Sequence, residues 1–436
     1  MNLTQLKTLF VQAGGVTLYA KPLAENDNSK NQVYFGPGFQ ALNLFPNAGI
    51  VPDSSLKNPI FKAKLHFGWL LPTGQVADAP GAQLILYPQY PEVRCSGFLK
   101  GCKEAPSDLM AGRIKGRILF LGVTPDRRIL GYVVGPDSEI AAEFRAMQLQ
   151  PDQGVFAELK LPRIPGVEDA KAKLLAQLKR IHDLGWIDSK QLHSNGTLKP
   201  CLAQNCGGFT LEAEFGIPKN SQSEPDYLGW EIKQHSVANF DRPDSSGAIT
   251  LMTPEPNVGY YREHGMAEFV RKFGYPDKKG REDRLNFGGV HRVGERHSTT
   301  QLKLVSQGYD AKTGKITDAN GCIALVTASG EMAAGWAFSG IFEHWSRKHN
   351  KAVYVPSQCR TEPQRQYSYG HKVRLAQGTD SLRLLNALAT GTVYYDPGIK
   401  LEGASSDNPH SKPRSQFRIS SKNIGAIYEE VETVEL

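Results

Sequence analysis

Two carboxylates and a lysine, Asp226, Glu231 and Lys233, stand at a spacing suited to phosphodiester hydrolysis in the segment Glu224 to Lys233. On a strand, Glu231 and Lys233 are two residues apart and face the same side, while Asp226 precedes the strand and can fold back toward it. Neighbouring carboxylates repel each other unless a hard divalent cation such as Mg²⁺ lies between them. A lysine beside that cation can orient or deprotonate a water molecule and offset charge on a phosphate. The three residues therefore predict metal-dependent phosphodiester cleavage.

The neighbouring residues bear on whether these side chains form a site or a solvated surface. Apolar residues alternate with the polar positions, so the strand predicted over Leu228 to Lys233 is half buried. Glu212 stands on a helix predicted around Thr210 to Phe215 and could supply a third acid to the same cluster. The alternative is a solvated strand face, because an Asp, a Glu and a Lys at this spacing often occur by chance.

The elements before this segment divide the chain into two parts. The first 160 residues contain short apolar runs bounded by Gly, Pro, Asn and Asp, which is typical of a β-rich barrel or sandwich. These predicted strands are Val16 to Tyr19, Lys62 to Phe67, Gln83 to Leu86, Arg117 to Val123 and Ile129 to Val134. Leucine and isoleucine then recur at three- and four-residue steps in Glu168 to Leu184, which predicts an amphipathic helix. We expect domains over residues 1–160 and 168–436, joined by a Pro-containing linker over 161–167.

The second part mixes helices with strands, as expected of an α/β domain. Strands are predicted at Gln301 to Val305, Ile323 to Thr327 and Ala352 to Val355, and helices at Met332 to Lys348 and Ser381 to Leu388.

Composition excludes several classes of protein. With 436 residues, 40% hydrophobic and 22% charged, the chain is neither disordered nor collagen-like. The net charge of +7 suits a polyanionic partner. Basic residues outnumber acidic ones by eight to four between Tyr87 and Arg128 and by ten to five between Arg360 and Lys422, whereas the tail after Lys422 carries four glutamates and no basic residue. Two segments could therefore meet phosphates, and the tail is expected to point away from them.

Location is predicted from two absences in the sequence. No secretory signal and no membrane-spanning apolar run is visible, so we expect a cytoplasmic protein without a membrane partner. The six cysteines are too few for a disulfide framework, and we expect reduced thiols.

The central motif carries a family resemblance. Gly207-Gly208-Phe209-Thr210-Leu211-Glu212, then Gly216-Ile217, then Pro225-Asp226-Tyr227-Leu228-Gly229-Trp230-Glu231-Ile232-Lys233 resembles the core of the MvaI/BcnI family of type II restriction endonucleases. The resemblance implies an α/β (α+β) PD-(D/E)XK nuclease fold and Mg²⁺-dependent cleavage of double-stranded DNA at a short site with GC arms. Asp226 and Glu231 would be metal ligands, Lys233 would act on the water, and Glu212 would be a supporting acid. It also implies a monomer rather than a dimer and a cognate DNA methyltransferase in the host.

The same resemblance implies a clamp that reads DNA through its grooves. Guanine is read best by arginine, and other base edges by histidine or asparagine. The candidate DNA contacts are Asp396, His410, Arg414 and Arg418, with Arg292 and Arg296 in a Gly-rich, clasping loop. At strand spacing, Arg414, Gln416 and Arg418 share one face. Phosphate contact without base specificity is an equal alternative for the two arginines.

The first domain is similar to the EcoRII effector DNA-binding domain, a B3-like pseudobarrel, through Lys21-Pro22-Leu23-Ala24-Glu25-Asn26-Asp27 and the following Gln32-Val33-Tyr34. That similarity implies two recognition arms, one with Lys21, Asn26, Asp27 and Gln32 and the other with Arg94 and Lys100. The alternative is that residues 26–29 form a polar turn, which spacing alone favours.

Three functions are compatible with these observations. The first is a two-domain, site-specific, Mg²⁺-dependent DNA endonuclease of a restriction system. The second is a modification-dependent endonuclease in which the first domain senses an altered base. The third is a DNA-binding regulator with an idle nuclease fold, against which the intact Asp226, Glu231 and Lys233 argue.

Overall fold

The computed structural model describes residues 1–55, 58–162, 170–203, 205–219, 225–243 and 247–436. The chain divides into two compact units, Met1–Val167 and Glu168–Leu436. Residues 163–167 of the predicted linker, Glu168 at the predicted helix start and Glu224 of the central motif lie outside the described residues. Within the described ranges, no helix combines the length and apolarity needed to cross a lipid bilayer.

In its described residues, the first unit contains two antiparallel-rich sheets and four helices. The helices are α1 (Leu3–Gln12), α2 (Ala41–Leu44), α3 (Ser107–Ala111) and α4 (Glu139–Ala146). One sheet has the order β11 (Ala157–Glu158), β1 (Thr17–Pro22), β9 (Ile118–Val123), β10 (Ile129–Val134), β5 (Phe67–Leu70) and β6 (Val76–Asp78). The other has the order β2 (Val33–Pro37), β8 (Glu92–Ser96), β7 (Gln83–Tyr87), β4 (Ile60–Lys64) and β3 (Ile50–Asp53). Among the described residues no strand pairing joins the two sheets, so the predicted pseudobarrel is not seen as a closed barrel.

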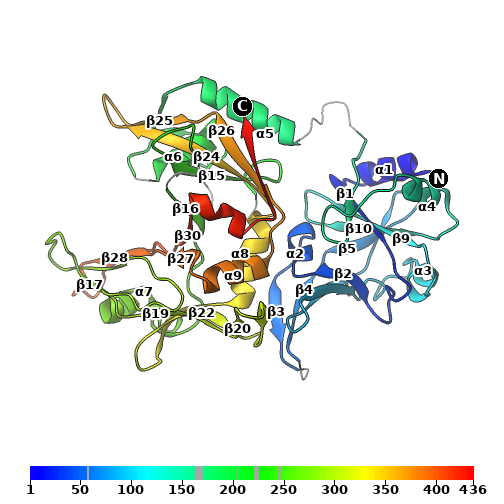
Figure 1. Ribbon diagram of the computed structural model, residues 1–436, viewed down its shortest axis with the longest axis horizontal. Coiled ribbons are helices and arrows are strands. Elements are labelled where there is room, and N and C mark those ends of the chain that lie inside the picture. Colours follow the sequence, from blue (N-terminus) through cyan, green and yellow to red (C-terminus); the bar gives the residue numbers. More distant parts are fainter. Residues whose placement is uncertain (56–57, 163–169, 204, 220–224, 244–246) are drawn as a thin grey trace. The chain divides into compact units, whose positions relative to one another are not determined.

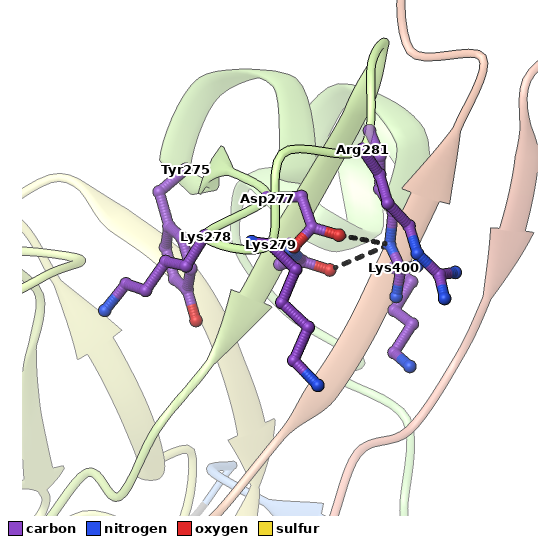
Figure 2. Close-up of a pocket in the computed structure, with 8 residues that line it drawn as sticks. Tyr275, Asp277, Lys278, Lys279, Arg281 and Lys400 are labelled. Carbon is purple, nitrogen blue, oxygen red and sulfur yellow. Dashed lines mark hydrogen bonds and ion pairs between the residues drawn. The ribbon is translucent and has the colours of Figure 1, made fainter.

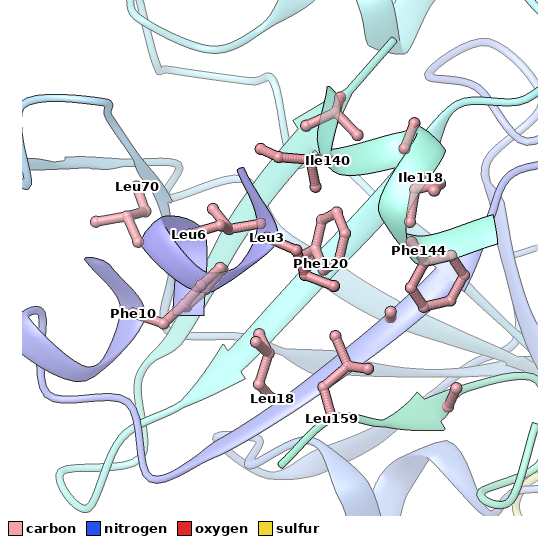
Figure 3. Close-up of a cluster of buried hydrophobic side chains, with 14 of the residues drawn as sticks. Leu3, Leu6, Phe10, Leu18, Leu70, Ile118, Phe120, Ile140, Phe144 and Leu159 are labelled. Carbon is pink, nitrogen blue, oxygen red and sulfur yellow. The ribbon is translucent and has the colours of Figure 1, made fainter. Parts of the chain in front are cut away.

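The core of this unit follows from the amphipathic pattern of its first helix (Figure 3). Asn2 caps α1 by accepting a hydrogen bond from the backbone N–H of Gln5, and the Gln5 side chain accepts one from the N–H of Asn2. The buried face of α1, at Leu3, Leu6 and Phe10, packs with Leu18 of β1, Phe120 of β9 and Phe144 of α4. The apolar side chains of α1, which recur every three or four residues, thus pack against apolar side chains that face the same side of the sheet at alternate strand positions.

The second unit is built around a mixed sheet with helices beside it. Its helices are α5 (Ala170–Asp183), α6 (Cys206–Glu214), α7 (Tyr260–Phe273), α8 (Phe338–Lys348), α9 (Ser381–Ala389) and the 3₁₀ turn η1 (Ser421–Ala426). The mixed sheet has the order β12 (Ile187–Asp188), β25 (Gln366–Tyr369), β24 (Lys351–Arg360), β26 (Lys372–Gln377) and β31 (Glu430–Glu435). In addition, β15 (Glu231–Ser236) pairs with β24 in parallel. Figure 1 shows α5 and α6 beside this sheet, and their apolar residues share one core with β15, β24, β25 and β26.

Smaller sheets complete the second unit. These are β13 (Lys190–Leu192) with β14 (Leu198–Pro200); β16 (Ala248–Met252), β30 (Phe417–Ser420) and β27 (Val393–Tyr395); β17 (Tyr275–Pro276), β18 (Arg284–Gly288), β28 (Gly398–Glu402) and β29 (His410–Lys412); β19 (Lys303–Gln307), β22 (Cys322–Val326) and β23 (Met332–Ala337); and β20 (Tyr309–Asp310) with β21 (Lys315–Ile316).

Several elements predicted in the second unit differ from the structure in their bounds or their type. The strand predicted from Leu228 begins at Glu231, because the residues before it form a turn. The helix predicted over Met332 to Lys348 is a strand up to Ala337 and a helix only after it. Its small residues are buried against β22, so packing overrides the helical propensity of alanine. The acidic tail does not point away from the second basic segment, because its strand β31 pairs with β26, which lies within that segment.

The cysteines also depart from expectation. Cys201 and Cys206, just before and at the start of α6, form a disulfide. The prediction that all six cysteines are reduced is therefore wrong for this pair, whose spacing of five residues was visible in the sequence. Cys95, Cys102, Cys322 and Cys359 are free thiols.

Candidate active site

A tight turn brings Asp226 alongside the strand that follows it. Tyr227 and Trp230 exchange two backbone hydrogen bonds of 3.0 and 2.8 Å, and the two residues between them have positive φ, 48° at Leu228 and 83° at Gly229. This backbone favours glycine at the second position and strains the leucine at the first. As a result, Oδ2 of Asp226 accepts a hydrogen bond of 2.9 Å from the backbone N–H of Ile232.

Glu231 and Lys233 follow on β15 and form a buried ion pair. Glu231 is only 1% exposed, and its Oε1 lies 2.5 Å from Nζ of Lys233. A second ammonium, that of Lys348 at the end of α8, lies 3.7 Å from the same oxygen. The parallel pairing of β15 with β24 sets Glu231 opposite Ala352 and Lys233 opposite Tyr354, so the segment that follows α8 comes next to the motif.

Helix α6 adds a third carboxylate to this cluster. A Cβ on Gly207 would come within 2.9 Å of the Gln234 side chain, so glycine permits the close packing of α6 on β15. The hydroxyl of Tyr369 donates a hydrogen bond of 2.7 Å to the carbonyl oxygen of Gly207 and fixes the helix start. Glu212, farther along α6, interacts electrostatically with Asp226, Glu231 and Lys233.

The carboxylates of the cluster differ in their protonation behaviour. Burial, and then repulsion from Asp226, raises the pKa of Glu212 to about 7. Burial and repulsion from Glu231 likewise raise the pKa of Asp226 to about 6. Burial acts the same way on Glu231, but Lys233 and Lys348 outweigh it and lower its pKa. The three carboxylates thus lie close enough to repel one another in buried surroundings that disfavour their charged forms.

The donor set of this cluster fits a hard divalent cation. Oε2 of Glu231 is buried and has no hydrogen-bond partner within the described structure. Asp226 offers a second carboxylate at the same edge of β15, and a cation would relieve the repulsion that raises its pKa. Among the described side chains no three acids, histidines or cysteines are arranged to surround an ion. Asp226 and Glu231 thus offer carboxylate oxygens, the donor type that a hard divalent cation takes.

Sequence reasoning missed Lys348 and His349. His349 is 1% exposed, stacks on Trp345 with ring centroids 4.0 Å apart, and donates from Nε2 to the carbonyl oxygen of Leu251. Burial, and then the positive charge of Lys233, lowers its pKa to about 3, so the imidazole is neutral. Both residues come close to the site because β15 pairs with β24, a strand far from it in the sequence. No local sequence motif predicts this position for them.

The predicted DNA contacts near the end of the chain fall into two groups. Arg418 on β30 donates to Oδ2 of Asp396 at 2.6 Å and to the carbonyl oxygen of Ala248 at 3.0 Å, so the structure brings two of the candidates together. His410 and Arg414 are exposed. The strand predicted through Arg414 begins only at Phe417, and Arg414 lies in the segment before it.

The Gly-rich segment after β18 is held by its own side chains. Buried His291 bonds to the carbonyl oxygen of Gly289 at 2.8 Å and to Oγ1 of Thr300 at 2.9 Å. Arg292 donates to the carbonyl oxygen of Gly391 and lies over the ring of Tyr394, while exposed Arg296 donates to the carbonyl oxygen of Gln301. Both arginines therefore have structural partners.

In the first unit, two predicted DNA contacts have an internal role instead. Lys21 and Asp27 are 4% and 5% exposed and form an ion pair of 2.5 Å. Asp27 also accepts hydrogen bonds from the backbone N–H groups of Ala24 at 3.0 Å and Tyr34 at 2.8 Å. The structure thus corrects the assignment of Lys21 and Asp27 to a DNA-reading arm, because a buried pair is not available to DNA.

Other candidates in this unit remain accessible. Asn26 is exposed, next to the buried pair. Arg94 is partly exposed, donates to Oε1 of Glu92 at 2.7 Å and lies 5.6 Å from the centroid of the Tyr87 ring.

The second unit is similar to known proteins over most of its length. The model of the MvaI/BcnI restriction endonuclease family matches residues 175–428. Among solved structures, restriction endonuclease MvaI in complex with its cognate DNA substrate is 15% identical, with 61% of this chain and 99% of that chain covered and a TM-score of 0.45. MvaI in the absence of DNA is 14% identical, with 62% and 98% covered and a TM-score of 0.33. No curated protein sequence matches.

Proposed function

Because the chain belongs to the MvaI/BcnI restriction endonuclease family, we propose that Asp226, Glu231 and Lys233, assisted by Glu212, hydrolyse phosphodiester bonds of double-stranded DNA with Mg²⁺. The protein is a type II restriction endonuclease, and its second unit has the restriction endonuclease-like fold. The observation that carries the assignment of residues is the buried cluster itself, in which Oε1 of Glu231 pairs with Lys233 while its Oε2 has no hydrogen-bond partner among the described residues.

Members of this family generally use divalent metal ions. We assign the ligands to Asp226 and Glu231, with Glu212 close enough to act on them electrostatically. When bound, Mg²⁺ supplies Lewis-acid polarisation of the phosphate and a water of lowered pKa. We propose Mg²⁺ because the donors are carboxylate oxygens, which this hard cation takes as ligands.

Lys233 has the clearest role among the protein groups. Attraction to Glu231 and Asp226 outweighs burial and raises the pKa of Lys233, so it is an ammonium at neutral pH. It can donate hydrogen bonds to an attacking water and to a phosphate oxygen, and it offsets the charge that develops there. We therefore propose that Lys233 orients the attacking water and stabilises charge on the phosphate, and that it does not abstract a proton.

Double-stranded DNA is the proposed substrate, as the solved MvaI complex contains cognate DNA. We propose that His410, Arg414 and Arg296 meet the duplex, and that Arg418 with Asp396 and Arg292 shape the reading surface around them. A short site with GC arms, a monomeric enzyme and a cognate methyltransferase belong to the same proposal.

The first unit lies outside the region that the family model matches. We propose that it is a second DNA-contacting domain, joined near residues 161–167 and acting through Arg94 and Asn26. Because it is additional to the matched region, a sensor of modified bases is the second candidate function. Equal cleavage rates on modified and unmodified DNA of one sequence would remove that candidate.

Cleavage of mixed-sequence plasmid tests the main proposal. The full chain with Mg²⁺ is expected to give discrete nicked or linear products, and Asp226→Ala and Lys233→Met to give none. Both variants should still bind duplex DNA, because the proposed groove contacts lie elsewhere. An Asp226→Ala protein that cuts as fast as the parent would refute the assignment.

A further inference from the structure

A basic cavity lies in the second unit, apart from the carboxylate cluster, at the turn between β17 and β18 (Figure 2). Its volume is about 270 Å³. The residues that line it come from β17, the turn, β18 and β28: Tyr275, Asp277, Lys278, Lys279, Arg281, Arg284, Asn286 and Lys400. Five of these are cationic and one is acidic.

The single carboxylate of the lining is already engaged. Oδ2 of Asp277 lies 3.4 Å from Nε of Arg284, whose side chain is 8% exposed, and Arg284 is also 3.7 Å from Glu402. Nε of Arg284 also donates a hydrogen bond of 3.3 Å to Oδ1 of Asn286. This buried arginine is therefore held in place by neighbours that belong to the fold.

The remaining cations are not neutralised by the fold. No described carboxylate lies within ion-pair distance of Lys279, Arg281 or Lys400. Figure 2 shows the ends of the Lys279 and Lys400 side chains on the same side of the turn, while Lys278 extends to the left of the view. Three lysines and an arginine, in addition to Arg284, thus line one cavity.

The strand pairing adds to this concentration of charge. Lys400 on β28 stands directly opposite Lys412 on β29, and like charges directly opposite each other on a sheet are destabilising. Partial burial, then Arg284, Arg281, Lys412 and Arg414, lowers the pKa of Lys400. A bound anion would remove this repulsion.

We propose that this cavity binds a phosphate group, and that its source is the DNA backbone outside the scissile bond. Guanidinium forks and ammonium groups together are the donors that suit phosphate oxygens. Arg414, a proposed DNA contact, contributes to the same positive field. The inference rests on the proposed function for its substrate, but the anion site stands on its own residues.

The test compares salt dependence of DNA binding in two matched double variants. Lys279→Gln/Arg281→Gln removes two exposed cations of the cavity, and Lys199→Gln/Lys312→Gln removes two exposed cations elsewhere. Anisotropy of a labelled mixed-sequence duplex is measured in EDTA over a range of salt concentrations. Each lost phosphate contact should reduce the slope of log K against log salt by about 0.9, and only in the first variant.

A second arm distinguishes free phosphate from the DNA backbone. Inorganic phosphate and pyrophosphate are titrated into the wild-type protein and the cavity variant, and the melting temperature is followed. Stabilisation of the wild type alone, with equal DNA slopes, would assign the cavity to a free phosphate. Equal slopes and equal melting temperatures would overturn the inference. A wild-type protein that does not bind DNA would instead refute the proposed function, and the phosphate arm would still test the cavity.

Discussion

Replacing Asp226 by asparagine is expected to stabilise the metal-free protein while it abolishes cleavage. Burial and the nearby Glu231 carboxylate raise the pKa of Asp226 from 3.8 to about 6. Between these two pH values the folded state holds a proton that the unfolded state has lost, so stability falls as pH rises through this range. Above pH 6 the full penalty of the ionised carboxylate is present. It amounts to about 3 kcal/mol as an upper estimate.

Asparagine removes this penalty and keeps the shape of the side chain. Its amide oxygen can still accept the hydrogen bond that Asp226 receives from the N–H of Ile232. At pH 8 in EDTA, we expect the variant to melt about 5 °C above the wild type. At pH 5 the difference should shrink to about half, because the wild-type carboxyl is then mostly protonated in the folded state.

Scanning calorimetry of the full chain measures these differences. Asp407→Asn, which removes an exposed carboxylate of the same type, is the control and should leave the melting temperature within about 1 °C. Added Mg²⁺ should stabilise the wild type and not Asp226→Asn. A variant that is no more stable than the wild type at pH 8 would refute the view that the cluster holds excess negative charge.

Three further changes probe the fold around the candidate sites. Lys21→Met should cost about 3–5 kcal/mol in urea unfolding, because it leaves Asp27 charged and buried, yet it should not weaken DNA binding by the folded protein; weaker binding without loss of stability would restore the pair to a DNA-reading role. Burial and then His297 lower the pKa of His291 to about 4, so its contribution to stability should fall between pH 6.5 and pH 4, and His291→Gln should flatten the urea-derived stability profile there. Gly229→Ala should cost about 1 kcal/mol at its positive φ and lower kcat more than it raises KM; unchanged kinetics would show that the turn does not position Asp226.

The proximity of the cluster residues was predictable because strand alternation and one helix suffice to relate them. Glu231 and Lys233 share a strand face, and the family motif adds Asp226 and Glu212. The left-handed turn at Leu228 could not be inferred from an apolar residue that continues the strand pattern. Both the strand propensity of the residues from Leu228 onward and their apolar alternation predict a longer strand. Only the turn seen in the structure shows that the strand begins later.

The features of the site and the fold that the sequence did not predict depend on packing between residues far apart in the chain. Lys348 reaches Glu231 because α8 leads into β24, and β24 pairs with a strand more than a hundred residues earlier in the chain. Met332 to Ala337 forms a strand for the same reason, since its neighbours in β22 bury it. The sequence also does not show which residue a charged side chain pairs with. It therefore could not predict that Lys21 is buried in an ion pair and not exposed on the surface.

The path of the chain through the second unit limits how such an enzyme can acquire a new specificity. The chain leaves the mixed sheet after β15, forms the strands β16 to β23, returns to it with β24 to β26, and then leaves again so that β28 and β30 can pair with β18 and β16. The strands of this sheet and the segments that carry the candidate DNA contacts therefore alternate along the chain. A reading module therefore cannot be exchanged by one cut and one join. New recognition should arise by substitution within surface turns, whereas the separate first unit can be gained or lost in a single recombination event.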